Sequence, residues 1–238
     1  LTGQQTLMRA SVLVVGAGGL GCPLLQYAVA AGIGNIGIID DDTVALHNLH
    51  RQVLYTTADI GKPKADTAAA RLRQMNPDVT ITVYNERLTT ANCLSIFQHY
   101  DWIADGTDNF ATRLAVNRTA VALQIPLLSA AVGRFQGQVG AFAGHLPDHS
   151  CYRCFVGDAF DAEDCDTCAD DGMLGAMAGW TGAFAAMQAI RVLLAPIGGL
   201  GEVQWGTLHT LDGLAPGMRS FRIAKDPACT TCGESGPD

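Results

Sequence analysis

A glycine-rich turn and a later carboxylate are the first residues whose types and spacing could do chemistry. The turn, Gly16-Ala17-Gly18-Gly19-Leu20-Gly21, follows a short apolar run and opens an apolar, helix-like segment. Glycines let the backbone approach a phosphate closely, and the N-terminus of a helix favours an anion. Asp40 follows 19 residues after Gly21, where a carboxylate can accept hydrogen bonds from ribose hydroxyls. The pattern predicts a nucleotide site without distinguishing NAD, FAD or ATP.

Basic and amide side chains after Asp40 favour a triphosphate over a dinucleotide. Asn48, Arg51 and Gln52 follow it closely, and Lys64 lies in the next motif along the chain. Guanidinium and ammonium groups neutralise phosphate charge through strong hydrogen bonds, and NAD binding requires no such group of residues.

A third polar segment, DGTDN at 105–109, contains Asp108 and Asn109. It follows a predicted strand, and ligands of open α/β sheets bind at the carboxyl ends of strands. A carboxylate there can hold Mg²⁺ between phosphates. The alternative is that Asp108 caps the helix expected over 109–123.

Six of the eight cysteines form three Cys-x-x-Cys pairs, at 151/154, 165/168 and 229/232. A chain of 238 residues does not need disulfides to fold, so the pairs indicate metal or thiol chemistry. Spacing alone favours the first two pairs as one set of ligands. A tail rich in Pro, Gly and Ser would fray unless tied down, which favours the first and third pairs. Four thiolates from either combination would make a closed, structural zinc site.

The elements that position these residues alternate between strand and helix through residues 1–145, the expected nucleotide-binding core. This alternation predicts a Rossmann-like α/β fold, a mostly parallel sheet with helices on both faces. Strands are expected at 11–15, 36–40, 79–84, 102–105 and 126–131, and helices at 20–31, 63–75, 92–99 and 110–123.

Residues 146–238 depart from this alternation, although the whole chain, 1–238, is expected to form one domain. A strand is expected at 137–143 and a long crossover loop at 149–171. A long interface helix follows at 174–194, and antiparallel strands at 203–211 and 218–223 precede the zinc-binding tail.

Charge and hydropathy exclude several classes of protein. The net charge of −8 argues against nucleic acid or an anionic membrane surface as a partner. The uncharged segment at 173–190 is barely long enough to cross a membrane and is rich in Ala and Gly. It is better explained as a buried or subunit-interface helix, which predicts a homodimer. The first ten residues do not resemble a signal peptide, so a cytoplasmic location is expected.

Seven motifs in register make the chain resemble the MoeB/ThiF/HesA family of ubiquitin-activating-enzyme-like proteins, and most closely its molybdopterin-synthase adenylyltransferase branch. The resemblance implies a nucleotidyltransferase that uses ATP and Mg²⁺ to adenylylate the C-terminal Gly of a small ubiquitin-like sulfur carrier ending in Gly-Gly. It also implies a structural zinc held by Cys151, Cys154, Cys229 and Cys232. A separate sulfur donor is expected, because no rhodanese-like segment follows Cys232 in this sequence. The motifs are GAGGLG at 16–21, DDDTVALHNLHRQ at 40–52, IGKPKA at 60–65, DGTDN at 105–109, CYRC at 151–154, CADDGMLG at 168–175 and CTTCG at 229–233.

The resemblance assigns roles to individual residues. Gly19 would pack against the nucleotide and Asp40 would hold the ribose, with Asp42 and Gln52 in the same matched stretch. Asn48 would contact phosphates. The expected catalytic residues are Arg51 and Lys64 on the phosphates, Asp108 on Mg²⁺, and Cys168, which in some members forms a covalent link with the carrier or relays sulfur.

Three alternatives remain open on the sequence alone. The enzyme could serve a thiazole or cysteine pathway with a different carrier. It could be an NAD-binding redox protein with Cys165 and Cys168 as a reversible disulfide. It could also be a catalytically impaired scaffold, because relatives carry an arginine-bearing arm before the first strand and residues 1–10, LTGQQTLMRA, do not match it.

Overall fold

The computed structural model describes residues 2–157, 172–198 and 200–233, in which eight strands form one sheet in the order β3-β2-β1-β4-β5-β6-β7-β8. The first five strands are parallel, and β6, β7 and β8 continue the sheet antiparallel. This confirms the expected fold class. The strands are β1 (Ser11–Val15), β2 (Asn35–Ile39), β3 (Thr80–Tyr84), β4 (Trp102–Asp105), β5 (Leu127–Val132), β6 (Gln136–Phe142), β7 (Thr207–Asp212) and β8 (Gly217–Arg222).

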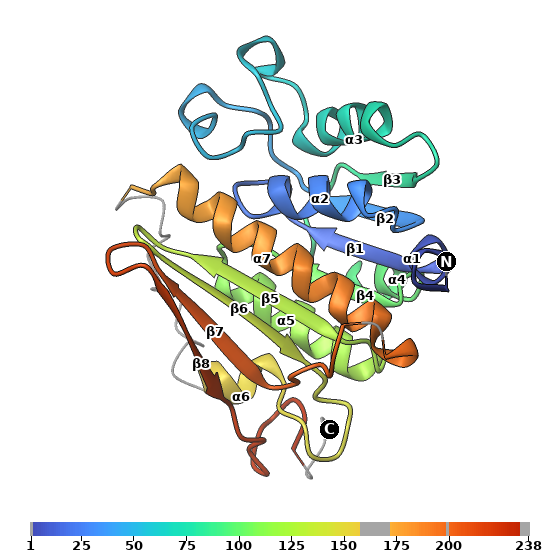
Figure 1. The fold of residues 1–238 in the computed structure, drawn as a ribbon, viewed down its shortest axis with the longest axis vertical. Helices are drawn as coiled ribbons and strands as arrows, with labels where there is room; N and C mark the ends of the chain where they lie inside the picture. The colour runs from blue at the N-terminus through green and yellow to red at the C-terminus, as the bar shows by residue number, and fades with distance from the viewer. Residues whose placement is uncertain (1, 158–171, 199, 234–238) are drawn as a thin grey trace.

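Helices cover both faces of the sheet (Figure 1). The long helix α7 crosses one face together with α2 and α3, and α4, α5 and α6 lie on the other. The helices are α1 (Thr2–Arg9), α2 (Gly21–Ala30), α3 (Lys64–Met75), α4 (Cys93–Phe97), α5 (Phe110–Ala122), α6 (Tyr152–Val156) and α7 (Gly175–Leu194), with short 3-10 helices η1 (Leu46–Asn48), η2 (Thr57–Asp59) and η3 (Ala195–Ile197).

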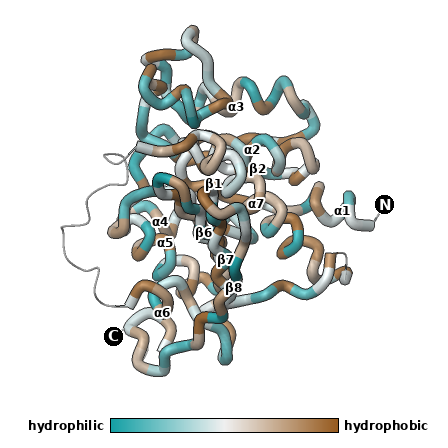
Figure 2. The backbone as a smooth tube through the Cα atoms, turned by 60° about the vertical axis from the view of Figure 1, so that its left-hand side comes forward, coloured by the Kyte–Doolittle hydropathy of each residue, from teal (hydrophilic) through white to brown (hydrophobic). Residues whose placement is uncertain are grey.

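Strand β1 is apolar along its whole length because both of its faces are buried. Val12 and Val14 pack in the core beneath α2 and α7, whereas Leu13 and Val15 pack in the core beneath α4 and α5. Continuous apolar runs of this kind are typical of parallel strands with helices on both sides. In α3, by contrast, hydrophilic and hydrophobic segments alternate, as expected of a helix at the periphery (Figure 2).

The strand register places the predicted motifs at one edge of the sheet. Val15, the last residue of β1, pairs with Ile39 of β2 on one side and with Asp105 of β4 on the other. The glycine turn, Asp40 and the DGTDN segment therefore all emerge where the strand order reverses. Open α/β sheets bind their ligands at this kind of switch point.

Three details of local structure differ from the sequence analysis: an element that was not expected, an expected loop that contains a helix, and an alternative that the structure excludes. Residues 1–10, which are assigned no element above, contain α1, whose Leu7 is buried. The loop expected at 149–171 contains the short helix α6, while residues 158–171 lie outside the described part of the chain. Asn109, and not Asp108, caps α5, because its side chain accepts a hydrogen bond from Thr112 N.

Candidate nucleotide site and cysteine cluster

A cavity of about 800 Å³ opens at the carboxyl ends of β1, β2 and β4. Every residue predicted to bind the nucleotide lines it, with the exception of Gly21. The lining includes Gly16, Gly18, Gly19, Asp40, Asp42, Asn48, Arg51, Gln52, Lys64, Asp108 and Asn109. The fold therefore brings together residues from segments that are up to 93 positions apart, from 16 to 109, in one enclosure.

The glycine turn has the backbone conformation that its sequence suggests. Gly16 adopts a φ of +91°, which residues with a side chain rarely adopt, and its N–H donates to Ile39 O at 2.9 Å. A Cβ at Gly21 would lie 2.0 Å from Gly16 O. Gly21 thus serves the close packing of the turn on the start of α2, which explains why it does not line the cavity.

Asp40 ties the glycine turn to the end of β2. Its Oδ2 accepts from Ala17 N at 2.7 Å, and its Oδ1 accepts from Asp42 N at 2.9 Å. Burial raises the pKa of this carboxyl, and the two backbone donors act in the opposite direction. A carboxylate oxygen can accept more than one hydrogen bond, so Asp40 retains acceptor capacity toward the cavity.

Lys64 places an ammonium group in the wall of the cavity. The residue is buried, with 4% of its surface exposed, and its Nζ donates to Asp42 Oδ2 at 2.8 Å. The buried hydroxyl of Tyr55 donates to both Ala17 O, at 2.8 Å, and Lys64 O, at 3.2 Å. Tyr55 therefore joins the glycine turn to the start of α3.

Arg51 and Gln52 lie next to the glycine turn, since a Cβ at Gly19 would lie 3.5 Å from Arg51 Cγ and one at Gly18 would lie 3.6 Å from Gln52 Nε2. Arg51 Nη2 donates to Asn48 Oδ1 at 2.8 Å, which orients the guanidinium group, and Nη1 donates to His50 Nε2 at 2.8 Å. Gln52 is 3% exposed, and its Oε1 has no hydrogen-bond partner in the described chain. A buried acceptor without a partner is costly, so this atom fits a ligand that donates a hydrogen bond in the cavity.

Asp108 lies exposed on the turn between β4 and α5 and makes no hydrogen bond to another residue of the described ranges. The capping role belongs to its neighbour Asn109, so the Asp108 carboxylate does not have to be shared with a helix N-terminus. Its position at the mouth of the cavity fits the chemistry of an Mg²⁺ ligand, which is typically a carboxylate beside substrate phosphates.

Arg113 is a residue of this site that the sequence analysis missed. It is 5% exposed, lines the cavity, and donates to Thr107 O, to Ala130 O at 2.7 Å and to Ser129 Oγ at 3.2 Å. The turn that carries Asp108 is thereby attached to β5. The sequence did contain a signal for Arg113, because its spacing places it on the same buried face of α5 as Val116 and Ala120.

The cavity continues beyond the nucleotide residues toward the antiparallel half of the sheet. There its walls are formed by β5, β6 and α6, including Val132, Gly133, Gln138, Tyr152 and Phe155. The enclosure therefore extends past the residues predicted to bind a nucleotide.

The N-terminal part of α7 borders the glycine turn and Arg51. A Cβ at Gly19 would lie 3.3 Å from Ala178 Cβ and 3.5 Å from Arg51 Cγ. Farther along α7, Thr181 and Ala185 are fully buried, whereas Trp180 and Met187 are 40% and 46% exposed. By length and composition alone, the segment from 175 to 197 could cross a membrane. Its inner face, however, is part of the main core.

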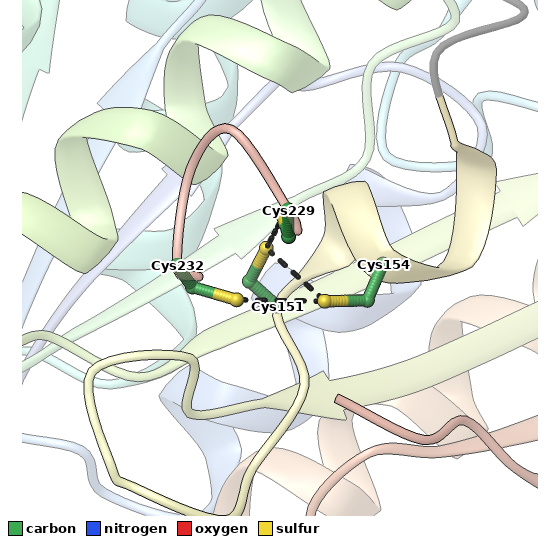
Figure 3. A group of neighbouring side chains, drawn as sticks. All are labelled: Cys151, Cys154, Cys229 and Cys232. Atoms are coloured by element: carbon green, nitrogen blue, oxygen red, sulfur yellow. Dashed lines mark hydrogen bonds between the residues drawn. The ribbon is translucent and has the colours of Figure 1, made fainter. Parts of the chain in front are cut away.

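Four cysteines meet between α6 and the C-terminal turn (Figure 3). The distances between sulfur atoms are 4.0 Å for Cys151 and Cys154, 3.7 Å for Cys151 and Cys229, and 3.4 Å for Cys154 and Cys232. Four thiolates about 2.3 Å from a tetrahedral zinc ion lie about 3.8 Å apart. The donor set therefore fits zinc, and among the described residues the tail pair, Cys229 and Cys232, joins Cys151 and Cys154.

Hydrogen bonds inside the cluster separate the pKa values of its thiols. The neighbouring Cys151 and Cys232 thiols lower the pKa of Cys154, and the Cys154 partner raises the pKa of Cys151. Metal ions bind thiolates and displace thiol protons, so zinc binding to this cluster would release protons.

Cys165 and Cys168 lie outside the described residues. The covalent role predicted for Cys168 and the reversible disulfide considered for the pair stay predictions.

Comparison with known proteins gives a consistent result. The family model described as the ThiF family matches residues 1–231. A sulfur carrier protein adenylyltransferase of Thermus thermophilus is 44% identical over 237 residues, which cover 98% of this chain and 85% of that protein. An adenylyltransferase and sulfurtransferase MOCS3 of Sus scrofa is 41% identical over 233 residues, covering 98% of this chain and 50% of the relative. The chain thus spans about half the length of the MOCS3 relatives that it matches.

Solved structures share the fold at lower sequence identity. A crystal structure of E. coli MccB with ATP has a TM-score of 0.82 and 21% identity, and covers 97% of this chain and 69% of that chain. A second E. coli MccB structure, with MccA-N7isoASN, has a TM-score of 0.84 and 20% identity, and covers 98% of this chain and 69% of that one.

Proposed function

Because the chain belongs to the ThiF family, we propose that it adenylylates the C-terminal Gly of a small ubiquitin-like sulfur-carrier protein that ends in Gly-Gly. We assign the reaction to molybdopterin or related cofactor biosynthesis, in line with the sequence motifs. One observation carries the proposal. A single cavity collects the glycine turn, a carboxylate suited to ribose, two cationic side chains and an exposed carboxylate at a switch point.

The chemistry requires little from the protein beyond positioning and charge neutralisation. A C-terminal carboxylate has a pKa of about 3.3–3.7, so it is ionised at neutral pH and needs no general base. One of its oxygens attacks the α-phosphorus of ATP. The bond between that oxygen and phosphorus forms while the bond from phosphorus to the α,β-bridging oxygen breaks, and its electron pair leaves with pyrophosphate. The products are an acyl-adenylate and pyrophosphate.

Different residues around the cavity bind the nucleotide and neutralise its charge. The backbone of the glycine turn and the N-terminus of α2 face the phosphates, while Asp40 and Gln52 accept hydrogen bonds from the nucleoside. Arg51 and Lys64 neutralise the charge that moves onto pyrophosphate as the bond breaks. Asp108 would hold a magnesium ion, which supplies further charge neutralisation when bound. The carrier tail occupies the extension of the cavity along β5 and α6, where Gly133 and Tyr152 form part of the wall.

The cysteine cluster has a structural role in this account. Zinc held by Cys151, Cys154, Cys229 and Cys232 would tie the C-terminal turn to α6 and leave no open coordination position for catalysis.

A second copy of the chain is the partner that fits α7. The outer face of this helix carries exposed apolar side chains, among them Trp180 and Met187. We place the homodimer interface there, with a separate protein as sulfur donor and the cytoplasm as the location, since ATP and reduced thiols are available there.

Pyrophosphate release tests the proposal. The purified chain is mixed with ATP, Mg²⁺ and a ubiquitin-like sulfur carrier from the same genome, with either an intact or a truncated Gly-Gly end. Release should require the intact end. No release with any such carrier, together with saturable binding of NAD, would favour the redox alternative.

A further inference from the structure

Arg113 connects the carboxylate predicted to hold Mg²⁺ with the rest of the site. Its guanidinium group donates to Thr107 O, in the residue before Asp108, and to Ala130 O and Ser129 Oγ on β5. Because these acceptors belong to two separate segments, Arg113 fixes the turn after β4 against the neighbouring strand. The position of Asp108 therefore depends on how firmly Arg113 is held.

Tyr152 covers Arg113 from the side of α6. The guanidinium carbon lies 5.9 Å from the centroid of the Tyr152 ring, a distance at which cation and ring attract each other. Both side chains are buried, with 5% of each exposed. Tyr152 directly follows the cluster residue Cys151, so a displacement of the cysteine cluster moves the ring that packs on Arg113.

Asn117 lies one helical turn after Arg113 on α5 and contacts the cluster directly. Its Oδ1 accepts from Tyr152 N at 2.9 Å, and its Nδ2 donates to Cys151 Sγ at 3.4 Å. Asn117 is 1% exposed and Cys151 is fully buried. A buried amide that uses both ends in this way fixes the start of α6 relative to α5.

We propose that Asn117 is a positioning residue that links the cysteine cluster to the turn carrying Asp108, so that zinc in the cluster steadies that turn. The inference rests on the proposed function only for the role of Asp108. Side chains that donate hydrogen bonds to metal ligands typically change metal affinity by about 10–100-fold when they are replaced. In this chain the same side chain also accepts from the backbone N–H of Tyr152, whose ring packs on Arg113. Asn117 therefore contacts both the cysteine cluster and the residue that covers Arg113.

The first experiment measures zinc release and needs no enzymatic activity. Zinc-loaded wild type, Asn117→Ala and Arg118→Ala are mixed with excess chelator, and release is followed by the absorbance of the zinc–chelator complex. Arg118 is the matched control, because it follows Asn117 on α5 and is exposed. Asn117→Ala should release zinc about tenfold faster or more than wild type, and Arg118→Ala should release it at the wild-type rate.

The second experiment follows the turn itself by amide hydrogen exchange of peptides covering 105–109. In wild type, removal of zinc should speed exchange in this turn while β1 and β2 keep their protection. Zinc-loaded Asn117→Ala should already show the faster exchange. The wild-type comparison stands even if the variant fails to fold.

Three results would overturn the inference: exchange at 105–109 that does not respond to zinc removal, zinc release from folded Asn117→Ala at the wild-type rate, or a wild-type protein that takes up no zinc. Failure of the proposed function would look different. Zinc-loaded wild type would then release no pyrophosphate with any Gly-Gly carrier, whatever the release and exchange data show.

Discussion

The ammonium group of Lys64 lies 2.8 Å from Oδ2 of Asp42, although the two residues are 22 positions apart and differ sharply in exposure. The Lys64 side chain is 5% exposed, whereas that of Asp42 is 66% exposed. An ammonium group has three protons to donate, so this ion pair orients the lysine at the cavity wall and leaves donors for a phosphate.

Removing the cations or the predicted Mg²⁺ ligand should nearly abolish activity. Arg51→Ala, Lys64→Ala and Asp108→Ala should each lower carrier-dependent ATP–pyrophosphate exchange by about 100-fold or more, roughly 2.7 kcal/mol at the transition state. Asp42→Asn should cost less than about tenfold, because it removes an orienting partner and keeps the lysine charge. Near-normal exchange in all three alanine variants would refute the assignment of the site.

The zinc content of variants should depend on the four cysteines of the cluster and not on the total number of cysteines in the chain. Cys229→Ser/Cys232→Ser should lose the metal, since it removes half of the sulfur atoms that meet in the cluster. The matched variant Cys165→Ser/Cys168→Ser removes the same number of thiols and should keep about one zinc per chain. Plasma emission spectrometry measures both. The opposite pattern would assign the metal to the pair at 165/168.

The apolar outer face of α7 should hold two chains together. Light scattering at micromolar concentration should give twice the chain mass of 25.0 kDa. Trp180→Glu/Met187→Glu should shift the mass toward that of one chain, because it would bury two charges in the interface. Met218→Glu is the control, since Met218 is also exposed but lies on β8. A wild-type protein with the mass of one chain would contradict the dimer.

Asp59 should stabilise the fold in a pH-dependent way. Thr56 N, Arg71 and Lys62 donate to its carboxylate, and these bonds, the backbone donor first, lower its pKa. A lowered pKa in the folded state stabilises the protein above the unfolded-state pKa of about 3.9, and this stabilisation is lost as the pH falls through the folded-state value.

Urea unfolding tests this linkage. Asp59→Asn should lower the free energy of unfolding by about 1–2 kcal/mol at pH 7, a modest value because the Arg71 partner is partly exposed. The difference should persist to about pH 5 and shrink below about pH 4. The exposed control Asp78→Asn should change little at any pH. A difference that grows on acidification would contradict the sign of the shift.

The sheet and the nucleotide residues were predictable from the sequence because their signals are local. Continuous apolar runs mark the parallel strands, and each polar motif directly follows one of them, so strand order alone brings Gly16, Asp40 and Asp108 together. Helix α1 was missed because it is short and mostly polar, with Leu7 as its buried residue.

Residues that act through tertiary contacts were not predictable in the same way. Tyr55 joins Ala17 to Lys64 through a hydroxyl whose partners become apparent only when the fold is known. Arg113 and Asn117 could have been suspected as polar residues on the inner stripe of α5, but their partners on β5 and α6 are set by the fold. The sequence alone left open whether Asp108 caps α5, because Asn109, equally suited to capping, is the next residue.

Formation of the acyl-adenylate is the most direct test of the central claim. The chain is incubated with ATP, Mg²⁺ and the sulfur carrier, and the intact mass of the carrier is measured after rapid quenching. The account predicts a gain of one AMP on a carrier with its Gly-Gly end, no gain on the truncated carrier, and none with Lys64→Ala. A carrier that keeps its mass while the wild-type protein binds both ATP and the carrier would contradict the account.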